Sequence, residues 1–263
     1  MDEGLVEYYS DRRELDRLEH GSGLFEAART QELLSRYLPS GAALLDVGGA
    51  GGYYAEWLAR SGHSVRLLDP VPLHVAEARR RAGTPQLFEA EVGEAGNLPA
   101  LDASVDAVLL LGPLYHLTKR DDRLQALCEA ARVCVPGGLI FAAAISRLAP
   151  PLDGIGKGWI VDEHKLTTVK LQMRDGASGD HQDGFPAVSY FHSPDELMQE
   201  ASDSGLAVEG VYGLEGPTWF LPDIEARWHD VGMRERMLWL ARELEREPSA
   251  LALSAHLLLV ARV

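Results

Sequence analysis

The pattern of apolar and polar residues predicts alternating strands and helices in the central part of the chain. Residues 42 to 47 form an apolar run that only Asp46 interrupts, as in a strand buried on both faces. Residues 53 to 60 begin a helical pattern, and residues 64 to 69 form a second strand that ends in the carboxylate of Asp69. A strand, a turn, a helix and a second strand in this order are typical of a parallel α/β sheet.

The same kind of pattern continues toward the C-terminus. Ser193, Pro194 and Glu196 form a capping box with proline in the first turn, which predicts the start of a helix. The other elements that we predict are a strand within 102–111, a helix at 119–134, a strand entered at 135–141, a helix at 194–204, a strand at 207–212, mostly helical structure over 222–247 and a last strand within 250–263.

The chain of 263 residues is long enough for one large α/β domain with accessory segments. Residues 1–39 read as an N-terminal helical cap, and residues 40–149 as the core of the sheet. A Pro/Gly-rich boundary at 150–158 opens an insertion over 150–190, and residues 191–263 complete the sheet. We expect the cap and the insertion to close over a site at the strand ends.

A glycine-rich turn follows the first predicted strand, because residues 44–52 read LLDVGGAGG. Such a turn lets the backbone approach a ligand, and the amides at the start of the next helix point toward it. A dinucleotide fingerprint, G-x-G-x-x-G, fits in neither register. Counted from Gly48 its third glycine falls on Tyr53, and counted from Gly49 it falls on Tyr54.

The alternative pattern D-x-G-x-G-x-G matches Asp46, Gly48 and Gly52 and departs from the chain only at Ala50. This is the first motif of the class I S-adenosylmethionine (SAM)-dependent methyltransferases, which the chain resembles. Further segments resemble that family in the expected order: the strand ending in Asp69, Gly93–Pro99 (GEAGNLP), Asp102–His116 beneath the transferable methyl group, and Val135–Phe141 at the turn into strand five.

The resemblance implies a Rossmann-like, mostly parallel sheet of seven strands with helices on both faces and an antiparallel last strand. It implies SAM as the cofactor, with S-adenosylhomocysteine (SAH) as the product, and Asp69 as the acceptor for both ribose hydroxyls. The cofactor-binding positions that it implies are Asp46, Gly48, Gly49, Ala50, Gly51, Asp69, Pro70, Glu94, Ala95, Leu111, Gly112 and Tyr115. Tyr9 is a further candidate, because the predicted N-terminal cap brings it toward the cofactor.

Methyl transfer requires the acceptor to be aligned with the cofactor and sometimes deprotonated. His116 directly follows strand four and is our first candidate for a base or an acceptor contact, against the alternative of a hydrogen-bonded loop histidine. Glu163, Tyr190 and His192 are weaker catalytic candidates in or near the insertion.

Composition excludes several classes of partner. A net charge of −15 opposes binding to nucleic acid, and we predict none. No apolar run of about 18 residues and no signal pattern appears, so we expect a cytoplasmic protein without membrane contact. Cys128 and Cys134 lie six apart on one predicted helix and indicate core packing rather than a disulfide or metal site. No spacing typical of metal ligands occurs, and the oligomeric state stays open.

The motifs bear on three candidate functions. The leading prediction is a SAM-dependent methyltransferase that acts on an O, N or C atom of a small-molecule acceptor. The alternative is a SAM-binding protein without catalysis, which regulates or scaffolds. A nicotinamide-dependent reductase is disfavoured by the failed dinucleotide spacing. The sequence leaves the acceptor open, because acceptor pockets in this fold are built from variable segments.

Overall fold

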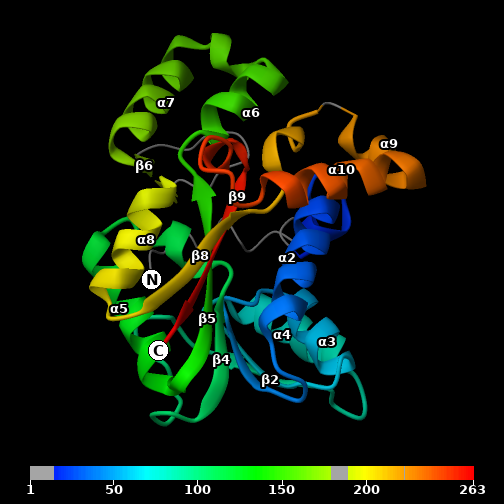
Figure 1. The fold of residues 1–263 in the computed structure, drawn as a ribbon. Helices are drawn as coiled ribbons and strands as arrows, with labels where there is room; N and C mark the ends of the chain where they lie inside the picture. Colours follow the sequence, from blue (N-terminus) through cyan, green and yellow to red (C-terminus); the bar gives the residue numbers. More distant parts are fainter. Residues whose placement is uncertain (1–14, 179–188, 222) are drawn as a thin grey trace.

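The structure is a computed structural model in which residues 15–178, 189–221 and 223–263 are described (Figure 1). In these residues nine strands form one mixed sheet with helices on both faces. Five strands lie parallel in the order β3-β2-β1-β4-β5. Their bounds are Ala43–Val47 (β1), Ser64–Asp69 (β2), Glu89–Val92 (β3), Val105–Leu110 (β4) and Cys134–Ser146 (β5).

Two C-terminal strands complete the sheet beyond β5. Strand β9 (His256–Arg262) runs antiparallel to β5, and β8 (Ala207–Gly213) runs antiparallel to β9. The direction of β8 is therefore the same as that of β5. The predicted Rossmann-like fold and its antiparallel last strand are confirmed.

The sheet has two strands more than the predicted seven. Strands β6 (Ala177–Ser178) and β7 (Ser189–His192) pair with each other, and β7 extends parallel to the end of β5 at Ile145 and Ser146. Ile145 also pairs with β9, which occupies the other edge of β5. Strand β7 therefore lies on the β4 side, beyond the end of β4, where it contacts the loop that follows β4.

Helices cover the two faces of the sheet with separate apolar clusters. Leu58 and Ala78 belong to the cluster on one face, and Leu127 and Leu197 belong to the cluster on the other. The helices of the first face are α2 (Gly23–Tyr37), α3 (Tyr53–Arg60) and α4 (Pro72–Ala82), and those of the second are α5 (Arg120–Val133) and α8 (Pro194–Asp203). Ser193 and Glu196 form the predicted capping box at the start of α8.

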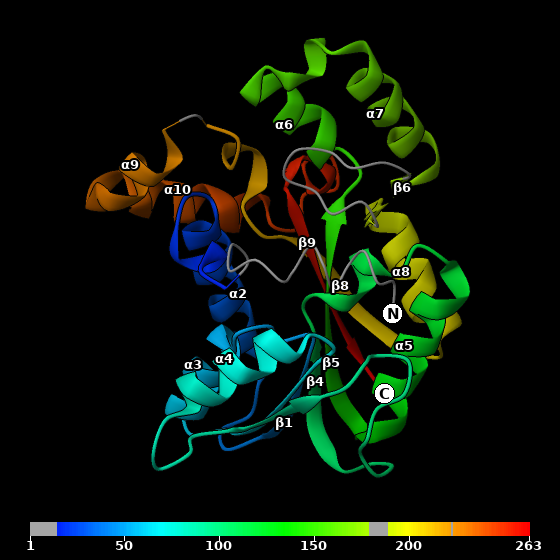
Figure 2. The same ribbon diagram turned by 180° about the vertical axis from the view of Figure 1, so that it is seen from behind.

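Four more helices lie beyond the end of β5, as Figure 2 shows from behind. They are α6 (Ala149–Lys157), α7 (Glu163–Asp175), α9 (Ile224–His229) and α10 (Val231–Leu244). Helix α6 occupies the segment that we read as a Pro/Gly-rich boundary. Pro150 and Pro151 stand in its first turn, where a missing amide hydrogen costs no helical hydrogen bond.

The cysteine prediction is wrong in two respects. Cys134 begins β5 rather than ending a helix, and Cys128 on α5 is exposed instead of packed in the core. Among the described residues, the helices are too short or too polar to cross a membrane.

Candidate cofactor site

A cavity of about 630 Å³ opens at the carboxyl ends of β1, β2, β3 and β4. This volume lies within the usual range of roughly 300 to 1,000 Å³ for small-molecule sites, and ligands of α/β sheets bind at this edge. The lining residues come from the strand ends, the loops after them and the starts of α4 and α5: Val47, Gly48, Ala50, Asp69, Pro70, Val71, His74, Gly93, Glu94, Ala95, Gly96, Asn97, Gly112, Pro113, Tyr115, His116, Leu117, Thr118, Lys119, Asp122 and Gln125.

The glycine turn is shaped by backbone conformations that favour glycine. Gly48 has φ 72° and Gly52 has φ 82°, both in the left-handed region. A Cβ atom on Gly48 would lie 2.9 Å from Cδ of Pro113, and one on Gly112 would lie 3.0 Å from the carbonyl oxygen of Gly48. The turn after β1 and the loop after β4 therefore pack directly on each other and form one wall of the cavity.

Asp69 lies at the end of β2 and holds the glycine turn in place. Its Oδ2 accepts a hydrogen bond from the amide of Ala50 at 2.9 Å. Its Oδ1 accepts one from the amide of Val71 at 2.9 Å and lies 3.0 Å from Nδ1 of His74. A carboxylate offers roughly four lone-pair sites. Asp69 therefore has capacity left for a ligand hydroxyl in the cavity.

Asp46 has the opposite surroundings at the end of β1. Its side chain is fully buried, and neither carboxylate oxygen has a hydrogen-bond partner among the described residues. Burial and, to a smaller extent, the nearby charge of Asp69 together raise the pKa of Asp46 to about 7. An unpartnered buried carboxylate beside the cavity fits a ligand that carries a positive charge.

The loop after β4 contributes two aromatic side chains to the cavity wall. Pro113–His116 form a short 3₁₀ turn, and the half-buried rings of Tyr115 and His116 contact each other with centroids 4.6 Å apart. Both line the cavity. The sequence did not predict the contribution of Val71, His74, Leu117, Thr118, Lys119, Asp122 and Gln125 to the lining. The charged residues that lead the helix at 119–134 were the available signal, since positions 122 and 125 lie on one helix face.

Several predicted cofactor residues lie beside the cavity rather than on its surface. Glu94 and Ala95 line it, but Asp46, Gly49, Gly51 and Leu111 do not. A Cβ atom on Gly51 would lie 2.9 Å from the Leu15 side chain, so the N-terminal segment packs on the turn. Tyr9 lies outside the described residues.

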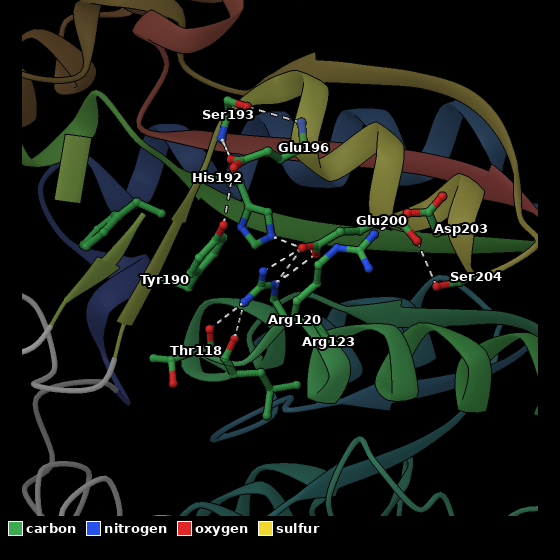
Figure 3. A network of polar contacts seen from close by, with 12 residues as sticks. Thr118, Arg120, Arg123, Tyr190, His192, Ser193, Glu196, Glu200, Asp203 and Ser204 are labelled. Carbon is green, nitrogen blue, oxygen red and sulfur yellow. Dashed lines mark hydrogen bonds and ion pairs between the residues drawn. The ribbon is translucent and has the colours of Figure 1, made fainter. Parts of the chain in front are cut away.

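The other three catalytic candidates do not line this cavity. Glu163 is exposed at the first position of α7. Tyr190 and His192 of β7 are buried in a network of polar contacts with Arg123 and Glu200 (Figure 3). The structure therefore brings only His116, among the four, to the cavity wall.

Comparisons with known proteins agree with this site. Residues 45–142 match the family model of a methyltransferase domain. The chain is 33% identical over 178 residues to a ubiquinone biosynthesis O-methyltransferase of Methylobacterium sp. (strain 4-46), covering 66% of this chain and 64% of that protein. It is 34% identical over 122 residues to a ubiquinone/menaquinone biosynthesis C-methyltransferase of Ruegeria sp. (strain TM1040), covering 44% and 47%. The chain thus spans less than two thirds of the length of these relatives.

A solved SAM-dependent methyltransferase from Mesorhizobium loti has the same fold, with a TM-score of 0.61 and 19% identity over 91% of this chain and all of that one. Residues 45–142 thus form a methyltransferase domain, and the chain shares the fold and the motifs of the class I SAM-dependent methyltransferases. SAM is the cofactor of this class. The residues fit it, because Asp69 offers acceptors for hydroxyls and Asp46 offers a counter-charge for a cation.

Proposed function

We propose that this chain transfers a methyl group from SAM to a small-molecule acceptor. The observation that carries the proposal is a single cavity that runs from Asp69, at the ribose-binding position, to Tyr115 and His116 on the loop after β4. A noncatalytic SAM-binding protein needs only the first half of that cavity.

The names of the relatives guide the choice of acceptor. They are an O-methyltransferase and a C-methyltransferase of quinone biosynthesis, so hydroxylated aromatic compounds are the first class to test. The net charge of −15 supports a small molecule over a nucleic acid, whose phosphates it repels.

The proposed chemistry gives three residues separate tasks. Bound SAM supplies an electrophilic methyl group. Asp69 holds the nucleoside end, Asp46 offsets positive charge, and an imidazole nitrogen of His116 accepts the proton of the acceptor's hydroxyl group. We also propose that the described parts of the predicted cap and insertion, 15–39 and 150–178, bound the acceptor side. They contain α2, most of α6 and α7, and α6 and α7 lie beyond the strand ends.

The test is a screen of small acceptors with radiolabelled SAM. We expect label to appear in at least one hydroxylated aromatic product, and His116→Ala should lower turnover by roughly a hundredfold or more while SAH still binds. His229→Ala is the control, because His229 is exposed on α9, outside the proposed cap and insertion, and does not line the cavity. A folded protein that binds SAH but labels no acceptor would favour the noncatalytic alternative.

A further inference from the structure

A buried guanidinium lies directly behind the cavity wall. Arg123 of α5 is only 1% exposed, and it forms a bidentate ion pair with Glu200 of α8. Its Nε donates to both carboxylate oxygens at 3.1 and 2.9 Å, and its Nη2 donates to Oε1 at 2.6 Å. Two parallel donors fix both the distance and the plane of the pair, which lysine cannot reproduce.

The third nitrogen of Arg123 reaches the loop that lines the cavity. Its Nη1 donates to the carbonyl oxygens of Leu117 at 2.8 Å and Thr118 at 3.0 Å. Both residues line the cavity and directly follow His116. The guanidinium therefore ties the backbone of the acceptor-side wall to α8, as Figure 3 shows.

Two side chains of strand β7 contact the Arg123–Glu200 pair. The Cζ atom of Arg123 lies 3.5 Å from the centroid of the Tyr190 ring, and Nε2 of His192 lies 3.2 Å from Glu200. Burial acts to raise the pKa of Glu200, but the hydrogen bonds from His192 and Arg123 outweigh it and lower that pKa to about 2. Glu200 is therefore ionised, and the pair keeps its full charge.

We propose that Arg123 is a positioning residue for methyl transfer, which sets the backbone of Leu117 and Thr118 and thereby the placement of His116 on the cavity wall. This proposal rests on the proposed function. It assigns Tyr190 and His192, which the sequence suggested as catalytic candidates, to the support of Arg123 and Glu200 instead.

A merely structural role would join α5 to α8 without any effect on the loop. The chain offers a matched control for that role, because Arg120 and Asp203 form a second ion pair between the same two helices. Arg120 is not among the residues that line the cavity, and 48% of its side chain is exposed. Arg120→Gln therefore removes a link between the helices and leaves the loop contacts in place.

The experiment compares Arg123→Lys, Arg123→Gln and Arg120→Gln with the wild type. Turnover, the acceptor's KM, SAH affinity and hydrogen exchange of residues 114–118 are measured for each. We expect turnover to fall at least tenfold in the Arg123 variants that fold, with SAH affinity within threefold and faster exchange in the loop. Arg120→Gln should stay within twofold of the wild type in all four.

Three results would overturn the proposal. One is wild-type turnover and loop exchange in a folded Arg123 variant. Another is an equal loss in Arg120→Gln, which would assign the effect to helix packing. The last is that neither Arg123 variant folds, which would make the guanidinium a requirement of the fold. Hydrogen exchange in the presence of SAH needs no acceptor, so absence of turnover in the wild type would count against the proposed function alone.

Discussion

Asp46 and Asp69 end neighbouring strands, and their surroundings differ in a way that separates their roles. Asp69 accepts two backbone hydrogen bonds and contacts His74, so it holds the glycine turn and still has acceptor capacity for a ligand. Asp46 is buried without a partner among the described residues. Leaving a buried carboxylate uncompensated costs free energy unless a proton or a ligand offsets its charge.

The raised pKa of Asp46 predicts pH-dependent cofactor binding. Because the folded-state pKa, about 7, exceeds the unfolded value, the ligand-free protein loses the stability of the protonated form as the pH rises toward and through 7. A cationic ligand favours the ionised form, so SAM affinity should rise about tenfold between pH 5.5 and 7. Titration calorimetry of wild type and Asp46→Asn checks this. Equal affinity of the wild type at both pH values would contradict it.

At the scale of elements, a buried charge cluster joins α2 to the start of β9. Nδ1 of His256 lies 2.6 Å from Glu215 and 3.5 Å from Glu26, and Arg17 pairs with Glu26. Burial alone would lower the pKa of His256, but Glu26 and Glu215 outweigh it and raise that pKa. The stabilisation is therefore complete below the unfolded value of about 6.5 and is lost as the pH rises through the higher folded value.

Glu215→Gln should therefore destabilise the fold in a pH-dependent way. Glu215 is 1% exposed, and breaking a buried pair costs roughly 3 kcal/mol, so we expect that loss of unfolding free energy at pH 6 and a smaller loss at pH 9. Urea unfolding at both pH values measures it. Glu209→Gln is the control, because Glu209 pairs with Arg262 at the surface, where ion pairs contribute little. The same loss at both pH values would show that His256 does not titrate with the cluster.

Elements with local signals were predicted closely. Helix α3 starts at Tyr53 as predicted, and α8 starts at the predicted capping box, because both starts are encoded in a few adjacent residues. Helix α6 was missed since its prolines and glycines are read as breakers unless their place in the helix is known. The β6–β7 hairpin was missed because β6 is only two residues long and β7 only four.

At the scale of the whole molecule, the order of strands could be inferred only through the resemblance to a family. The glycine turn and Asp69 were found from local spacing, and they lie together because β1 and β2 are adjacent and parallel. The cavity wall from α5 depends on how that helix packs across the sheet, which no local pattern fixes. For the same reason the burial of Tyr190 and His192 outside the cavity lining was not predicted.

The most direct test of the account is the affinity of SAH for wild type and Asp69→Ala, measured by titration calorimetry. The central claim is that the cavity at the ends of β1 and β2 holds the cofactor with Asp69 on its ribose. Loss of two hydrogen bonds to a charged acceptor removes roughly 3 to 6 kcal/mol, so Asp69→Ala should bind SAH at least a hundredfold more weakly, and NAD should bind the wild type weakly. Unchanged SAH affinity in a folded Asp69→Ala variant would contradict the account.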